Sequence, residues 1–269
     1  MIYLVTMSQT SPLSLRQNVL AFVEAVGEYT LFMREALVFF LKGRIHWSNT
    51  LKQMAFIGTD SLPIALITAL AVGMVFCLQI SDVMIKYGSS GVIGGVTAMS
   101  LARELTPSFT AVVVAGRVGA AITAEIGSMK VTEQLDALTA MAVPPMYYLL
   151  LPRMLSSIVM LPLLTLISLG VGLGGATLVG VSVKGLIITG FIDSIRSLLY
   201  VDDVIKMMIK SAFFGVIIAS IACYQGVRTG QGAQGVGQAT TKSVVFSLIT
   251  IFISNYILSF ILFSVMART

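Results

Sequence analysis

The chain has 269 residues, of which 57% are apolar and only 11% are Asp, Glu, Lys or Arg, and its mean hydropathy is +0.95. Because about a quarter of the residues in a soluble domain carry a charge, this composition excludes a water-soluble globular protein and indicates a membrane protein. The net charge of +5 does not indicate nucleic-acid binding, because the basic residues form no patch with interleaved aromatic side chains, and anionic lipid head groups are the expected partner.

The N-terminal part of the chain predicts a helix that lies along the membrane surface. In residues 13–42, apolar side chains alternate with too many charged ones for a span. Lys42, Arg44 and Lys52 follow beside Trp47, a combination typical of the head-group layer, and we place it on the cytoplasmic side. We therefore divide the chain into an interfacial region, residues 1–53, and a transmembrane domain, residues 54–269.

Five later stretches are long and apolar enough to cross a bilayer, which needs about 20 residues per helix. The second stretch is interrupted by Arg103, Glu104 and Pro107, so we expect a short helix, a break and then the spanning helix. Residues 182–204 are expected to form an outer loop with a short helix. The predicted fold class is all-α: a polytopic integral membrane protein with five transmembrane helices and an N-terminal amphipathic interfacial helix. The spans are predicted at residues 58–80, within 91–124, within 149–181, at 205–224 and at 244–266.

Two features of the second span each allow two interpretations. Arg103 and Glu104 either form an ion pair that fixes a helix end, or they act in gating or substrate contact. Ala111, Ala115 and Gly119 recur every four residues, and such a small face permits close helix packing, either within one subunit or across a dimer.

After Glu125 the pattern predicts a short amphipathic helix at the cytoplasmic surface, about residues 125–143, closed by Pro144 and Pro145. This helix either rests on head groups or docks a cytoplasmic partner. Its net acidic face favours the partner, because the inner leaflet is itself negative and attracts Lys and Arg.

The segment RTGQGAQGVGQATTKS, residues 228–243, has glycine spacings close to those of two nucleotide-binding loops. A phosphate-binding loop needs Lys where Gln238 stands, and both motifs need a preceding strand, whereas here an apolar span precedes. We therefore interpret residues 225–243 as a flexible cytoplasmic loop and expect nucleotide binding in a separate subunit.

Three segments together resemble the MlaE/YrbE family of permeases, the membrane subunits of ABC-type lipid transporters that work with MCE-domain proteins. These segments are AGRVGAAITAEIGSMKVTEQLDAL, PRMLSSIVMLPLLT and QGAQGVGQATTKSVV. The resemblance implies a homodimer in the bacterial inner membrane, cytoplasmic ATPase subunits that bind ATP and Mg, and an MCE assembly on the periplasmic side. It also implies a phospholipid or related cargo, moved for outer-membrane lipid asymmetry or lipid uptake, and no cofactor in this chain.

The chain departs from the family pattern at Asn255 in the last span, where relatives often carry Asp.

The resemblance also assigns residues to two sites. The residues implied for coupling to the ATPase are Glu125, Gly127, Met129, Thr132, Glu133, Gln134 and Asp136. Those implied for the lipid cavity are Phe76, Val83, Met84, Tyr87, Arg103, Glu104 and Leu105.

Two other classes of protein were considered. An ion-gradient-driven secondary transporter of a hydrophobic substrate needs a titratable residue deep in a span, and Glu104 is the candidate. An intramembrane enzyme needs a nucleophile and a base. With His46 as the sole histidine, and with Cys77 and Cys223 in apolar surroundings, the chain shows neither a catalytic set nor a metal site.

Overall fold

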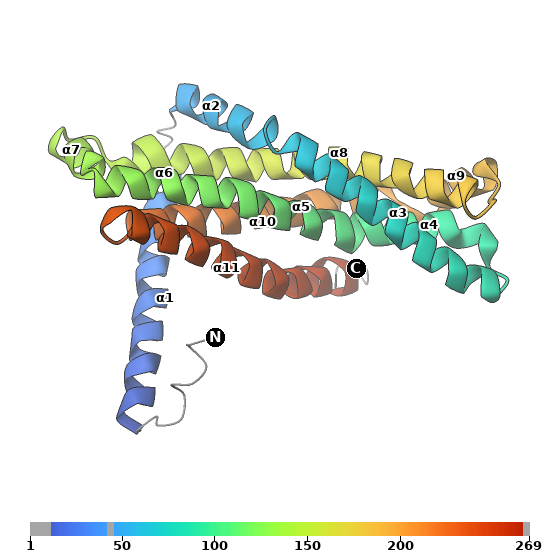
Figure 1. Cartoon of the computed structure of the whole chain (residues 1–269), viewed down its shortest axis with the longest axis horizontal. Coiled ribbons are helices and arrows are strands. Elements are labelled where there is room, and N and C mark those ends of the chain that lie inside the picture. Colours follow the sequence, from blue (N-terminus) through green and yellow to red (C-terminus); the bar gives the residue numbers. More distant parts are fainter. Residues whose placement is uncertain (1–11, 42–45, 266–269) are drawn as a thin grey trace. The chain divides into compact units, whose positions relative to one another are not determined.

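The computed structural model describes residues 12–41 and 46–265, which form helices joined by short turns (Figure 1). No β-strand occurs in this part of the chain, and the all-α prediction is confirmed. The contacts divide the chain into an N-terminal unit, residues 1–44, and a larger unit, residues 45–269.

The N-terminal unit contains one helix of 30 residues, α1 (Pro12–Leu41), which matches the predicted helix 13–42. Leu20, Val23, Leu31 and Leu37 on this helix are exposed, as expected if a lipid surface covers them. Its position on the membrane surface stays a prediction. Lys42 and Arg44 lie outside the described residues.

Within residues 46–265, the larger unit shows five helical segments that are long and apolar enough to cross a membrane, as predicted. These segments are Trp47–Lys86, Ser90–Val131, Met146–Ser182, Val201–Val227 and Gly232–Phe263. The helices within the unit are α2 (Trp47–Gly58), α3 (Leu62–Lys86), α4 (Ile93–Ser100), α5 (Thr106–Val114), α6 (Ala120–Val131), α7 (Gln134–Ala140), α8 (Leu151–Ser182), α9 (Ile188–Leu198), α10 (Val201–Val227) and α11 (Gly232–Ser259).

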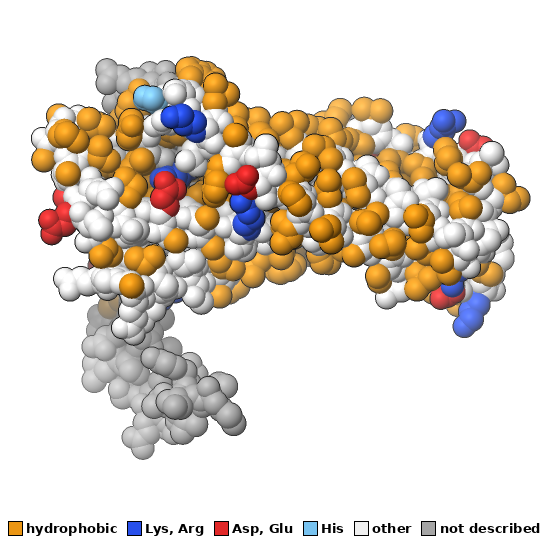
Figure 2. Space-filling model, turned by 45° about the horizontal axis from the view of Figure 1, so that its top comes forward, with side chains coloured by type: hydrophobic (Ala, Val, Ile, Leu, Met, Phe, Trp, Pro, Cys, Tyr) orange, Lys and Arg blue, Asp and Glu red, His pale blue; other side chains and the backbone are white. Residues whose placement is uncertain are grey.

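The long helices of this unit lie side by side, with α7 at one end and α9 at the other (Figure 1). Figure 2 shows one face of the unit, on which apolar side chains fill the middle while Lys, Arg, Asp and Glu gather toward the two ends. An apolar band between two charged ends is the surface that a bilayer covers. We refer to the two ends below as the α7 end and the α9 end.

The second span contains no break, so the prediction of one was wrong. The helix continues from Ser90 to Val131 because two π-helical segments, Leu101–Leu105 and Ala115–Gly119, widen it without interrupting it. Pro107 lies in the first turn of α5, directly after the first of these segments. A local π adjustment is a common way for a transmembrane helix to accommodate a proline.

The closest helix crossing of the unit is between α3 and α8, where two glycines face each other. A Cβ atom on Gly73 would lie 2.0 Å from the carbonyl oxygen of Gly172, and one on Gly175 would lie 2.8 Å from that of Leu70. Small residues let helix backbones approach closely in a membrane. The neighbouring buried core consists of Cys77, Ile93, Leu101, Ala102, Leu169, Ala176, Phe191 and Met207.

The small face of the second span packs inside the chain. Ala111, Ala115 and Gly119 are buried, and a Cβ atom on Gly119 would lie 3.3 Å from the Ile218 side chain of α10. Of the two interpretations of this face, the structure shows packing within one subunit. The next face of the same helix is open at Gly116, which is exposed.

The glycine-rich segment is mostly helical, so the prediction of a flexible loop over residues 225–243 was wrong. Helix α10 extends to Val227 and α11 begins at Gly232, which leaves a short turn between them. Gly232 has a φ of +72°, a left-handed conformation that favours glycine, and it directs the chain into α11. The glycines therefore serve the turn and the start of a helix rather than a mobile loop.

Candidate functional site

A cluster of charged side chains lies among the membrane-spanning helices. Lys210 of α10 is 0% exposed, and its Nζ donates to Glu104 Oε2 at 2.9 Å. The same Nζ donates to the carbonyl oxygen of Arg103, also at 2.9 Å. In an α-helix this carbonyl would accept from residue 107, which is a proline and has no N–H. One buried ammonium group therefore neutralises Glu104 and also satisfies a backbone acceptor beside Pro107.

Arg103 pairs with Asp203, which lies on α10 like Lys210. Its Nε donates to Asp203 Oδ1 at 2.8 Å, and the Asp203 side chain is only 4% exposed. Asp203 also accepts from the backbone N–H of Tyr200, at the start of α10. The guanidinium carbon of Arg103 lies 5.1 Å from the centroid of the Phe263 ring, within the range of a cation–π contact.

Helix α11 supplies the remaining hydrogen bonds of the cluster. Ser259 Oγ donates to Glu104 Oε1 at 2.6 Å, and Asn255 Nδ2 donates to Glu104 Oε2 at 3.0 Å. Asn255 Oδ1 in turn accepts from Ser108 at 3.0 Å. Glu104 thus receives donors from α10 and α11, although its own side chain remains 43% exposed.

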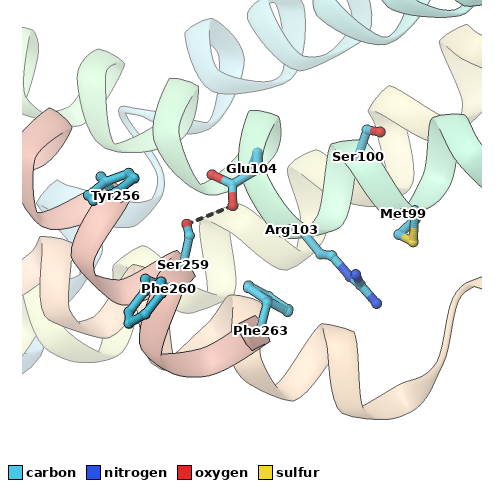
Figure 3. Close-up of a pocket in the computed structure, with 8 residues that line it drawn as sticks. All are labelled: Met99, Ser100, Arg103, Glu104, Tyr256, Ser259, Phe260 and Phe263. Atoms are coloured by element: carbon cyan, nitrogen blue, oxygen red, sulfur yellow. Dashed lines mark hydrogen bonds between the residues drawn. The ribbon is translucent and has the colours of Figure 1, made fainter. Parts of the chain in front are cut away.

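The exposed side of Glu104 faces a cavity of about 400 Å³ (Figure 3). In this view Glu104 points toward Ser259, whereas Arg103 extends to the other side of its helix. Aromatic rings from the end of the last span form much of the wall. A cavity with charged groups on one side and aromatic carbon on the other suits an amphiphilic molecule. The lining residues are Met99, Ser100, Arg103, Glu104, Tyr256, Ser259, Phe260 and Phe263.

A second, apolar groove of about 310 Å³ brings together two residues that the resemblance assigned to the lipid cavity. Phe76 of α3 and Leu105 of the π-helical segment both line it, together with Phe109 of α5. Leu105 directly follows Glu104 in the sequence, so the same π-helical segment contributes a residue to the groove and two to the charged cavity. The complete lining is Ala71, Val72, Val75, Phe76, Gln79, Leu105 and Phe109.

The other three residues assigned to the lipid cavity lie near the end of α3. Met84 packs against the buried core cluster. Val83 and Tyr87 are exposed, Tyr87 by 80%, at the C-terminal end of this helix. Their role in lipid contact stays a prediction.

The residues assigned to ATPase coupling all lie at the α7 end, on three successive pieces of structure. Helix α6 carries Glu125, Gly127 and Met129, and α7 carries Gln134 and Asp136. Thr132 and Glu133 form the turn between them, so the structure divides the predicted helix 125–143 in two. The division occurs at Glu133, whose φ of +61° is left-handed and cannot continue a right-handed helix.

An ion pair between a buried arginine and a half-exposed glutamate supports this end of α6. Arg153, in the first turn of α8, is 2% exposed, and its Nη2 lies 2.7 Å from Glu125 Oε1. Its Nε and Nη1 are buried without a hydrogen-bond partner in the structure. Glu125 therefore supplies the counter-charge of an arginine that lies in the helix core.

Sequence reasoning missed the partners of Arg103 and Glu104. Asp203 falls in the predicted outer loop, residues 182–204, and Lys210 falls in the predicted fourth span, where no partner was assigned to it. One signal was available, since Asp203 and Lys210 are seven residues apart and therefore lie on one face of a helix. No group of three or more His, Cys, Asp and Glu side chains among the described residues is arranged to hold a metal ion.

Comparison with known protein families shows to which family the chain belongs. A family model described as permease MlaE matches residues 50–261, which includes all five spans in large part and both sites. The chain belongs to the MlaE permease family. The resemblance drawn from the motifs is confirmed.

Individual MlaE-type relatives give the same result. A probable ABC transporter permease of Synechocystis sp. is 50% identical over 223 residues, which cover 83% of this chain and 85% of that protein. The chloroplastic protein TRIGALACTOSYLDIACYLGLYCEROL 1 of Arabidopsis thaliana is 44% identical, over 81% of this chain and 63% of that protein. A probable ABC transporter permease of Rickettsia typhi is 40% identical, over 93% and 96%. This MlaE-family chain is thus a multi-pass membrane protein and the permease subunit of an ABC transporter, which replaces the alternative of an ion-gradient-driven transporter.

Proposed function

We propose that this permease moves a phospholipid or a related lipid between the bacterial inner membrane and an MCE-domain protein on the periplasmic side. The observation that carries the proposal is the cavity at Glu104, which combines a charged side with aromatic rings, while the same π-helical segment also lines an apolar groove. The polar head group binds beside Arg103 and Glu104, and an acyl chain follows the groove past Leu105 and Phe76. One relative is named after a galactolipid, trigalactosyldiacylglycerol, which supports a lipid cargo.

The functional unit is a homodimer in this proposal. Tyr256 and Phe260 line the cavity and yet are exposed by 75% and 56%, so the cavity is open on the side of α11. The last span is the least buried of the five spans: only 11% of its most apolar stretch is covered by the rest of the chain. A second copy of the chain closes the cavity and covers this helix.

Energy for transport comes from cytoplasmic ATPase subunits, which bind ATP and Mg, while this chain catalyses no covalent step. The subunits dock at the α7 end, on the residues from Glu125 to Asp136. Helix α6 is continuous with the π-helical segment that carries Arg103 and Glu104, because the whole stretch Ser90–Val131 is one helical segment. Movement of the docking residues therefore reaches the cavity through a single helix.

The proposal is tested by purifying the tagged permease in mild detergent and reconstituting it with the co-purifying ATPase and MCE proteins in liposomes. We expect phospholipid bound to the permease by mass spectrometry, and lipid transfer to the MCE protein that requires ATP. Glu104→Ala should lower transfer at least tenfold while the ATPase still co-purifies. Transfer that proceeds without ATP, or a permease that carries no lipid, would contradict the proposal.

A further inference from the structure

A polar pocket of about 410 Å³ lies at the α7 end, away from the lipid cavity. Two turns that are far apart in the sequence form it. One is the α6–α7 turn with Glu133, and the other is the α10–α11 turn that includes Thr229 and Gln231. The lining residues are Lys130, Val131, Glu133, Asp136, Thr229, Gly230, Gln231 and Gly232.

The α10–α11 turn is fixed against α6 by close contacts. A Cβ atom on Gly127 of α6 would lie 2.6 Å from Thr229 Oγ1. One turn of α10 earlier, a Cβ atom on Gly226 would lie 2.7 Å from the Cβ of Ile126. Thr123 Oγ1 donates to the carbonyl oxygen of Ala222 at 3.1 Å, which joins the same two helices again. The wall that the turn forms is therefore held directly on the segment that carries the coupling residues.

The turn is also folded tightly on itself. A Cβ atom on Gly235 would lie 2.3 Å from the carbonyl oxygen of Gly230, so α11 starts against the turn that precedes it. Gly230, Gly232 and Gly235 are the glycines whose spacing resembles a dinucleotide loop. In the structure Gly230 and Gly232 line the pocket, and Gly235 packs against Gly230.

The charges around the pocket leave one carboxylate free. Lys130 Nζ lies 3.3 Å from Asp136 Oδ1, so these two groups neutralise each other. Among the described residues no ion pair involves Glu133. The N-terminus of α11 has no side-chain cap and adds a partial positive charge of roughly one half, which is smaller than the full charge of a carboxylate. The charged side chains that line the pocket, Lys130, Glu133 and Asp136, therefore sum to one negative charge.

The backbone at Glu133 is strained as well. Its φ of +61° is a left-handed conformation that disfavours a residue with a Cβ atom. Holding such a residue there costs on the order of 1–3 kcal/mol, and such strain is found most often at functional sites. A glycine would satisfy the turn without strain, but it would bring no carboxylate to the pocket.

We propose that the α10–α11 turn is a second part of the ATPase docking surface, and that the pocket accepts a basic side chain, Lys or Arg, of the ATPase subunit, with Glu133 as its counter-charge. The occupant is basic because the charged side chains that line the pocket sum to one negative charge. It belongs to the ATPase because the pocket is continuous with the coupling residues Glu133 and Asp136. This inference rests on the proposed docking of an ATPase at the α7 end.

Cysteine cross-linking tests the surface on the intact complex in membranes. The two native cysteines, Cys77 and Cys223, are buried, so an introduced exposed cysteine is the reactive one. Gln231→Cys probes the α10–α11 turn, and Gln134→Cys probes the coupling helix itself. Ile187→Cys, exposed at the α9 end, gives the background. We expect both probes to cross-link to the ATPase subunit at least tenfold above the background.

Charge substitution tests the chemistry of the pocket. Glu133→Gln keeps the size of the side chain and removes its charge, and we expect at least a tenfold weaker binding of the purified ATPase subunit. Glu133→Asp keeps the carboxylate and should bind within threefold of the native protein. Glu133→Lys should abolish binding, and native-like size-exclusion behaviour of each variant shows that the fold is retained.

The outcomes distinguish a failure of this inference from a failure of the proposed function. If Gln134→Cys cross-links but Gln231→Cys does not, or if Glu133→Gln binds as tightly as the native chain, the inference is wrong while ATPase docking stands. If Glu133→Lys binds more tightly, the occupant is acidic and the inference is also wrong. If neither probe cross-links and no ATPase co-purifies, the proposed function fails with it.

Discussion

The ammonium nitrogen of Lys210 lies 2.9 Å from the carboxylate of Glu104, although the two residues are 106 positions apart in the sequence. The pair joins α10 to the π-helical segment of the second span, where Pro107 removes a backbone donor. Burying an ammonium group is costly unless it is paired and fully hydrogen-bonded. Here three acceptors surround it, since Ser259 Oγ lies at 2.7 Å in addition to Glu104 and the Arg103 carbonyl.

Removing Glu104 should therefore destabilise the fold more than removing both members of the pair. Glu104→Ala leaves Lys210 charged and buried, which costs about 3 kcal/mol, the lower end of the range for broken buried pairs, because the Glu104 side chain is itself 43% exposed. The double variant Glu104→Ala/Lys210→Met places an apolar side chain in the core and should recover most of this loss. Thermal unfolding in detergent measures both. Equal loss in the single and double variants would show that the pair is not the cause.

Asp203 and its neighbour Asp202 provide a matched comparison. Asp203→Ala removes the acceptor of Arg103 and of the Tyr200 N–H, and should lower the free energy of unfolding by about 1–3 kcal/mol. Asp202 is exposed and pairs with Lys206 one turn later, at 2.6 Å. Asp202→Ala should cost only about 0.3–0.5 kcal/mol. Unfolding curves of the two variants, compared with the native protein, check this order, and a larger loss for Asp202→Ala would contradict it.

Two glycines, Gly73 of α3 and Gly174 of α8, have opposite expectations. Gly73→Ala forces a methyl group to within 2.0 Å of the Gly172 carbonyl, so we expect α3 and α8 to separate and the protein to aggregate on extraction. Gly174→Ala meets nothing within 4 Å and should gain up to about 1 kcal/mol from helix propensity. Size-exclusion profiles and thermal unfolding distinguish them. A monodisperse Gly73→Ala protein of native stability would disprove the close crossing.

The Arg153–Glu125 pair is suited to a double-mutant cycle. Glu125→Ala leaves Arg153, which is 2% exposed, without its counter-charge and should cost about 1–3 kcal/mol, less than for a fully buried pair because Glu125 itself is half exposed. Arg153→Met removes a buried charge and should be close to neutral in stability. The double variant should therefore resemble Arg153→Met alone. The coupling energy comes from unfolding measurements on all four proteins, and additivity of the two single effects would mean that the pair contributes nothing.

Much of the fold follows from the order of apolar and charged residues. The five spans were predictable because each exceeds the thickness of a bilayer, and Arg103 and Glu104 stood out because they interrupt an apolar run. The ends of spans were less predictable: α3 continues past residue 80 to Lys86, and α10 begins at Val201 rather than residue 205. Charged residues at the end of a span look like loop residues until their partners are known.

The composition of the charged cluster was not predictable for the same reason. Lys210 and Glu104 meet only after two separate helices have packed together, and no local pattern records that contact. The π-helical segments were also invisible, because a widened turn contains the same residue types as an α-helical one. The glycines at residues 230–235 led to the wrong prediction of a flexible loop, since glycines also permit a tight turn at the start of a helix.

The buried position of Lys210 has a consequence for how the protein is made. A lysine at the centre of a helix that enters the bilayer alone costs roughly 2.5–3.5 kcal/mol during insertion by the translocon. Helix α10 is synthesised after the span that carries Glu104, so its counter-charge is already in the membrane when Lys210 leaves the ribosome. Pairing with Glu104 offsets this cost, so assembly with that earlier span favours the insertion of α10 and links the biogenesis of the C-terminal half to that of the N-terminal half.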